Sequence, residues 1–113
     1  MLPEDRIRFW HIIDEAVEAC TFVEGLAFDE FVKDGKTARA VIRSIEVIGE
    51  AASKVSMKLR KQHSDVPWGK IIGMRNRLIH VYFDIDYTVI WKTVKENLPP
   101  LIKQLESILE KDK

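Results

Sequence analysis

The amino-acid sequence predicts an all-α protein, folded as an antiparallel bundle of four to five helices. Apolar residues recur at spacings of three and four in several long stretches, which is the periodicity of a helix with one buried face. No segment alternates apolar and polar residues for long enough to indicate a strand. The chain has 113 residues, the size of one domain, so we expect residues 1–113 to form a single compact unit without repeats or linkers.

The first helix is expected to begin at Pro3, because proline is tolerated in a first turn and the acidic Glu4 and Asp5 suit the positive end of the helix dipole. It should end within residues 25–28. Its buried face is predicted to carry Ile13, Ala16, Val17, Cys20 and Val23. The single cysteine, Cys20, is therefore interpreted as a small buried apolar residue of a protein from a reducing compartment.

The second helix should follow a turn at residues 33–36 and continue to Leu59, with basic residues at its carboxyl end, where they suit the dipole. Its apolar stripe consists of Val41, Ile45, Ile48, Ala52, Val55 and Leu59. A third helix is expected to begin near Asp65 and Pro67, two residue types that favour a helix start.

A fourth helix is expected after Asp84 and Asp86, whose carboxylates can cap its amino end. Pro99 and Pro100 should break or kink this helix, because proline lacks the amide hydrogen and disfavours a helical residue before it. The apolar pattern then resumes at residues 101–109, which completes the predicted bundle.

Charge is balanced over the chain but unevenly distributed. Eighteen basic and eighteen acidic residues cancel, so no overall field attracts nucleic acid. Residues 51–80, however, include seven basic residues and one acidic residue, whereas residues 1–35 include nine acidic and three basic residues. Residues 51–80 are therefore the part of the chain in which a phosphate-binding site would gain most from the local potential.

Four chemically distinct side chains lie together at the end of this positive stretch. Arg75, Asn76, His80 and Tyr82 provide a permanent cation, an amide, an imidazole and a phenol. Arginine can hold a phosphate in a planar fork, histidine can transfer a proton near neutral pH, and asparagine can orient the substrate or the imidazole. This set is suited to cleaving a phosphodiester without a metal ion.

The spacing of these residues predicts a homodimer. On one regular helix Arg75 and His80 are separated by about 140° around the axis, whereas Asn76 and His80 share a face. One helix therefore does not aim all three side chains at one atom. We expect both that the helix loosens near residues 81–83 and that a second copy of the chain supplies the missing groups.

Three segments resemble a known family. The pattern Arg75-x4-His80-x-Tyr82 is similar to the signature of HepT-like proteins, a branch of the HEPN superfamily of small helical ribonucleases. Residues 43–51 resemble that family's second-helix pattern, and residues 66–76 resemble its approach to the catalytic helix. All three segments occur in the family's order, so the resemblance extends over nearly the whole chain.

The resemblance implies a toxin of a two-gene toxin–antitoxin system that cleaves RNA as a homodimer. Arg75 and His80 would be catalytic, with Asn76 as the polar residue that follows the arginine. The implied partner is a minimal nucleotidyltransferase antitoxin, which would transfer AMP from ATP to Tyr82. No cofactor is implied.

Other interpretations of these residues stay open. Arg75 could pair with Glu46 or Glu50 while His80 caps a helix end, and Tyr82 could pack in the core. The chain could also be a non-catalytic nucleotide-binding or scaffold subunit that partners a nucleotidyltransferase. A DNA-binding regulator is disfavoured, because the chain has no net charge and no second basic helix to enter a groove.

Further candidates carry less weight. Lys70 and Arg77 could contact RNA phosphate, although a solvated surface position also suits Arg77. No metal is expected, since His11 with Asp14 or Glu15 lacks a third ligand. Neither a signal peptide nor a membrane span is predicted, so we expect a cytoplasmic location.

Overall fold

The structure, a computed structural model, describes residues 1–79 and 85–112, with the backbone alone at residues 75, 76, 78 and 79. These ranges contain helices and no strand, which confirms the all-α prediction. The helices are α1 (Pro3–Phe22), α2 (Phe28–Lys33), α3 (Gly35–Ser53), α4 (Met57–Gln62), α5 (Trp68–Ile79), α6 (Tyr87–Lys92), the π-helical segment η1 (Thr93–Asn97) and α7 (Leu98–Lys111).

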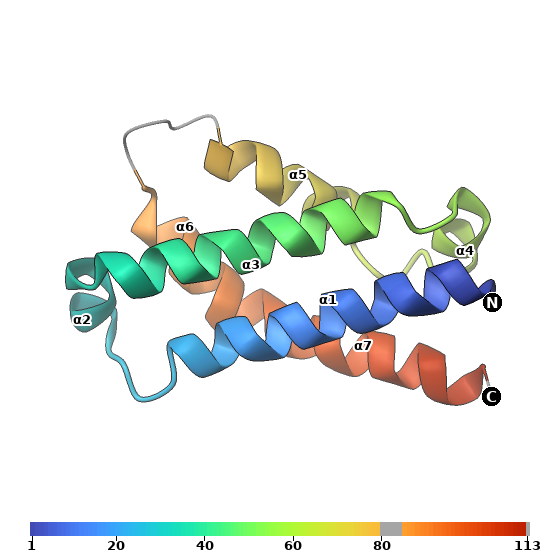
Figure 1. Ribbon diagram of the computed structural model, residues 1–113, viewed down its shortest axis with the longest axis horizontal. Coiled ribbons are helices and arrows are strands. Elements are labelled where there is room, and N and C mark those ends of the chain that lie inside the picture. Colours follow the sequence, from blue (N-terminus) through green and yellow to red (C-terminus); the bar gives the residue numbers. More distant parts are fainter. Residues whose placement is uncertain (80–84, 113) are drawn as a thin grey trace.

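The long helices form the predicted antiparallel bundle. Helix α1 packs against α3 and α7, and α5 packs along α3 (Figure 1). Each of these pairs is antiparallel, and the two chain ends lie at the same end of the molecule (Figure 1). There the Met1 amino group and the Arg6 guanidinium both lie within ion-pair distance of the Asp112 carboxylate, at 3.3 and 3.0 Å.

The core lies between α1, α3 and α7. Its fully buried members include Phe9, Ile12, Ala16, Val41, Ala52, Ile90 and Leu105. Val17, predicted on the buried face of the first helix, is instead 47% exposed. Val17 lies outside the face of α1 that contacts the other helices. The spacing of apolar residues did not predict where the edge of this face falls.

Trp68 fastens the start of α5 to this core. Its side chain is buried, its ring centroid lies 5.8 Å from that of Phe9, and its indole nitrogen donates a hydrogen bond of 3.0 Å to the His63 carbonyl oxygen. The amino end of α5 is thus held against α1 as well as α3.

The prediction that the second helix continues to Leu59 is wrong. Helix α3 ends at Ser53, and a separate short helix, α4, follows. The Ser56 hydroxyl oxygen accepts a hydrogen bond from the Leu59 amide and thereby caps α4. The buried Asp5 carboxylate accepts hydrogen bonds from both the Ser56 amide (2.8 Å) and the Ser56 hydroxyl (2.7 Å). Val55 and Leu59 are still buried, so the stripe is preserved across the break.

Helix α2 also was not foreseen. It occupies what was expected to be part of the connection between the first two helices, where Phe31 is buried against the rings of Tyr87 and Trp91. Asp34 then caps α3 by accepting hydrogen bonds from the amide and the hydroxyl of Thr37. These hydrogen bonds hold the pKa of the Asp34 carboxyl below its usual value.

The carboxyl-terminal helices follow one another without a break. Asp86 caps α6 as predicted, by accepting a hydrogen bond from the Val89 amide at 3.1 Å, whereas Asp84 lies outside the described residues. Pro99 and Pro100, predicted to break or kink this helix, do not end it: both lie in the first turn of α7. The π-helical segment η1 precedes them instead.

Cys20 of α1 faces the carboxyl-terminal part of the chain, at η1. Its side chain is half-buried, its sulfur lies 3.8 Å from the Val94 carbonyl oxygen, and burial raises the pKa of its thiol. Within the ranges that the structure describes, none of the helices is both long and apolar enough to cross a membrane.

Candidate functional site

Helix α5 carries the first half of the Arg75-x4-His80 motif. Arg75, Asn76 and Arg77 lie in its last turns, two turns or more beyond the anchoring Trp68. His80, Tyr82 and the expected loosening at residues 81–83 lie outside the described residues, and so do the side chains of Arg75 and Asn76. The catalytic and modification roles of these residues therefore stay predictions.

Lys70 and Arg77 share one face of α5, and both are exposed. Seven residues apart, they are separated by about two turns, or roughly 10 Å along the axis. Both line a hollow of about 620 Å³ between α5 and the segment formed by η1 and α7. The two residues predicted to contact RNA phosphate thus share one wall of one groove.

The floor of this hollow, which we name the α5–α7 groove, is mostly apolar. Ile45 and Ile48 of α3 and Leu98 and Leu101 of the last helix contribute to its lining. The carboxylate of Glu96 lines it as well, so the groove does not carry positive charge alone. Its cations are therefore placed beside surface that could receive the flat face of a base.

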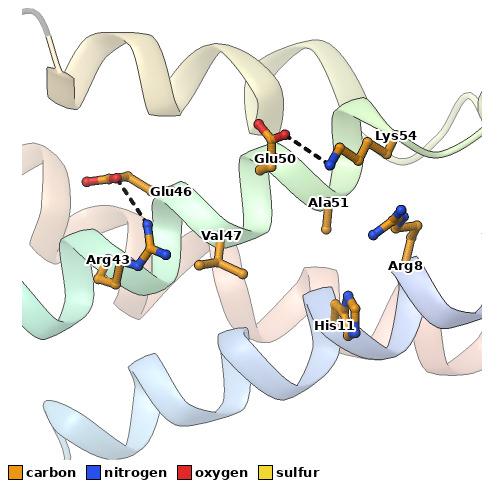
Figure 2. A pocket seen from close by; sticks show the side chains of 8 residues that line it. All are labelled: Arg8, His11, Arg43, Glu46, Val47, Glu50, Ala51 and Lys54. Carbon is orange, nitrogen blue, oxygen red and sulfur yellow. Dashed lines mark ion pairs between the residues drawn. The ribbon is translucent and has the colours of Figure 1, made fainter.

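A second hollow, of about 410 Å³, lies between α1 and α3. Figure 2 shows Arg8 and His11 projecting from α1 toward side chains of α3. We name this hollow the α1–α3 groove. Its lining residues are Arg8, His11, Arg43, Glu46, Val47, Glu50, Ala51 and Lys54.

Two ion pairs connect side chains of α3 along this groove. The Arg43 guanidinium lies 3.7 Å from the Glu46 carboxylate, and the Lys54 ammonium lies 3.3 Å from the Glu50 carboxylate (Figure 2). The Arg43 side chain is 75% exposed and the Lys54 side chain 52% exposed. Such solvated pairs contribute little to stability, about 0–1 kcal/mol each.

The sequence alone did not reveal the α1–α3 groove, because its two walls are more than 30 residues apart in the chain. One signal was available: Arg8 and His11 are three residues apart, so they share a face of α1. Which residues of α3 lie opposite them follows only from the packing of α1 on α3.

Glu15 lies farther along the same junction of α1 and α3. Partial burial is the largest cause that raises the pKa of Glu15, and the nearby Glu18 carboxylate raises it further. The Ser44 hydroxyl and the Arg43 guanidinium lower this pKa by smaller amounts. The junction thus carries a carboxyl group whose ionised form is disfavoured by folding.

No group of three or more histidine, cysteine, aspartate or glutamate side chains is positioned to hold a metal ion in the described part of the chain. The side chains that line the α1–α3 groove include cations, which bind anions, and carboxylates, which bind proton donors.

Comparison with known proteins gives one consistent result. The family model described as "Ribonuclease HepT-like" matches residues 12–108 of the chain, a span that includes α3, α5 and the motif. No solved structure matches the chain.

Named relatives agree with the family model over most of their length. A protein of Caldanaerobacter subterraneus subsp. tengcongensis, whose name is "Putative RNase", is 45% identical over 103 residues, which cover 91% of this chain and 92% of the relative. A Thermococcus cleftensis protein named "Probable ribonuclease HepT" is 41% identical over 97 residues, which cover 85% of this chain and 88% of the relative. A further "Putative RNase", from Methanocaldococcus jannaschii, is 38% identical over 111 residues, which cover 96% of this chain and 92% of the relative.

Proposed function

Since this chain belongs to the ribonuclease HepT-like family, we propose that it is a metal-independent endoribonuclease and the toxin of a two-gene toxin–antitoxin system. Its reaction would be carried by Arg75, Asn76 and His80. Its partner would be a minimal nucleotidyltransferase antitoxin that neutralises it by attaching AMP to Tyr82.

One observation carries this proposal: the family match includes the Arg75-x4-His80 motif, and the fold places the start of that motif on an anchored helix. Trp68 holds the beginning of α5, and α3 supports its length. Catalytic side chains need a rigid support of this kind, because small displacements cost large factors in rate. The exposed cations Lys70 and Arg77 on the same helix offer contacts for the RNA backbone.

The proposed reaction uses a nucleophile from the substrate. The RNA 2′-hydroxyl attacks the adjacent phosphorus, so the P–O2′ bond forms while the P–O5′ bond breaks. His80 accepts the proton of the 2′-hydroxyl while water gives a proton to the leaving O5′, or water accepts the first proton and His80 donates the second. Arg75 stabilises the negative charge that grows on the phosphate. The products are a 2′,3′-cyclic phosphate and a free 5′-hydroxyl.

A homodimer completes this site. Because Arg75 and His80 are offset by about 140° on a regular helix, two copies of α5 facing one another can present the cation of one copy and the imidazole of the other to one phosphate. Single-stranded RNA is the preferred substrate, since its backbone can bend until the attacking and leaving oxygens are in line.

Modification of Tyr82 would block the same site. In the transfer, the phenol oxygen attacks the α-phosphorus of ATP and pyrophosphate leaves. The attached nucleotide adds a phosphate charge and an adenine close to Arg75, where they compete with RNA both for space and for the cation.

Expression in a bacterial host without the antitoxin tests the nuclease. We expect the wild-type chain to arrest growth and fragment RNA, and His80→Ala to lose activity by roughly 10²–10⁴-fold, the usual contribution of a general acid or base. Arg75→Ala should fall by a comparable factor, because it removes the charge that stabilises the transition state. Purified protein should cleave RNA in the presence of EDTA, leave DNA intact and produce 2′,3′-cyclic ends.

His63→Ala and Arg39→Ala are matched controls, since both side chains lie outside the motif. Among the described residues, His63 takes part in the hydrogen bonds of α4 and Trp68 through its backbone. Both controls should remain toxic. If the wild type and all variants are equally harmless and RNA stays intact, a nucleotide-binding scaffold is favoured instead. If EDTA abolishes cleavage by the purified protein, the metal-independent mechanism is refuted.

A further inference from the structure

The α1–α3 groove contains a cation without a counterion. Arg8 is half-buried in its wall, and its side chain makes no ion pair or hydrogen bond with the residues that the structure describes. The other two cations of the groove are each paired along α3, Arg43 with Glu46 and Lys54 with Glu50. The groove therefore has one positive charge in excess of its carboxylates.

A partly desolvated charge without a partner is unfavourable, so a groove of this kind is suited to an anion. Arginine holds phosphate oxygens through two parallel N–H donors, and a neighbouring lysine adds a further donor. Figure 2 shows Arg8 and Lys54 at the same end of the groove, near Ala51. His11 contributes a ring nitrogen to the same wall, one turn along α1 from Arg8.

The carboxylates of the groove narrow the choice of anion. Glu46 and Glu50 would repel a group with two or more negative charges, such as a terminal phosphate, whereas a phosphodiester carries one charge and matches the single excess cation. Carboxylate oxygens also accept hydrogen bonds, and a ribose 2′-hydroxyl or a base amino group next to the phosphodiester can donate them. RNA provides all three groups in adjacent positions.

We propose that the α1–α3 groove binds a phosphodiester of the RNA substrate outside the bond that is cut, with Arg8 as its main contact. This inference rests on the proposed ribonuclease function. Helix α3 contributes residues to this groove and also supports α5, which carries the start of the motif (Figure 1). One RNA strand held in the groove would thus be tethered to the same helix that supports the catalytic arginine.

The test is RNA binding by a cleavage-deficient protein. In a His80→Ala background, the affinity for a fluorescently labelled single-stranded RNA is measured by anisotropy at several salt concentrations. Arg8→Ala should weaken binding about tenfold and reduce the slope of log affinity against log salt by about 0.7, the value for one lost contact to a single strand. Arg8→Lys, which keeps the charge, should retain the slope and lose part of the affinity.

Arg39→Ala is the matched control, because Arg39 is an exposed cation of α3 outside the groove. It should change affinity less than twofold. Equal weakening by Arg8→Ala and Arg39→Ala, or no weakening by either, would overturn the inference, provided that thermal melting shows each variant to be folded. Cleavage by the intact protein decides the proposed function separately: active wild type with unchanged binding by Arg8→Ala refutes only the groove.

Discussion

Tyr82 is the residue at which the proposed control of the nuclease acts. It follows His80 by two positions and Arg75 by seven, so a helix that continued through it would place Tyr82 within about 20° of Arg75. A phenol beside a guanidinium can be modified only if its oxygen is accessible to the transferase and ATP. Packing of Tyr82 in the core would prevent the reaction, and the two alternatives differ in a measurable product.

Incubation of the purified chain with its cognate nucleotidyltransferase and ATP should add AMP to Tyr82. Peptide mass spectrometry should locate the adduct there, and RNA cleavage should fall as modification proceeds, because the added phosphate competes for Arg75. Tyr82→Phe should remain an active nuclease that the transferase cannot silence.

Tyr87→Phe is the control for this experiment. Tyr87 is a half-buried tyrosine at the start of α6, with its ring 5.8 Å from that of Phe31. This variant should still be modified and silenced. An adduct on Tyr87, or none on the wild type, would contradict the assignment of Tyr82.

At the scale of elements, the junction of α1 and α3 combines a stabilising contact surface with an electrostatic cost. The apolar face of α1 is buried there, but Glu15 is partly desolvated and lies near Glu18. Its raised pKa means that folding favours the neutral carboxyl. The stability that this preference contributes is present in full below the pKa of the unfolded chain and is lost as the pH rises through the higher pKa of the folded chain.

Glu15→Gln should therefore raise the melting temperature at pH 7, because glutamine resembles the neutral carboxyl and carries no charge to desolvate. The difference from the wild type should shrink toward zero below about pH 4, where both the folded and the unfolded carboxyl are protonated. Melting curves followed by circular dichroism at several pH values provide the measurement. Glu24→Gln, at an exposed position beyond α1, is the matched control for the removal of one carboxylate from the surface.

At the scale of the whole molecule, the proposed site requires two copies of the chain. Two inactive variants should then restore activity when they are combined, because a mixed dimer contains one site with both substitutions and one with neither. If Arg75→Ala and His80→Ala chains associate at random, about one quarter of the wild-type sites are intact.

Co-expression or joint refolding of the two variants, followed by an RNA cleavage assay, measures this recovery. Each variant alone serves as the control and should stay inactive. Size-exclusion chromatography with light scattering should show a dimer for both. An inactive mixture of correctly formed dimers would indicate that Arg75 and His80 act within one chain.

Local rules were sufficient for much of the architecture. The helix start at Pro3 and the cap at Asp86 were predicted from residue type and were confirmed by α1 and by the hydrogen bond to the Val89 amide. They could be predicted because a cap or a first turn depends on residues four positions apart or fewer. The motif residues Arg75, Asn76, His80 and Tyr82 were likewise recognised from residue type, from spacing and from the family resemblance of the flanking segments, and their roles stay predictions.

Tertiary contacts decided the rest. Asp5 and Ser56 are 51 residues apart, and their hydrogen bonds fix the division between α3 and α4 that the continuous apolar stripe concealed. Phe31 is buried because Tyr87 and Trp91 lie beside it, which gives α2 a place in the fold. Arg8 likewise lies beside carboxylates that are already paired with cations of α3, and this follows from the packing of α1 on α3.

The sequence by itself thus determined the fold class, several helix starts and the candidate catalytic residues, because each depends on the type and spacing of neighbouring residues. Only the tertiary structure decided where α3 ends, which helix faces meet and which charges lack a partner. Packing and the pairing of charges depend on atoms from distant parts of the chain, and no local pattern contains both partners.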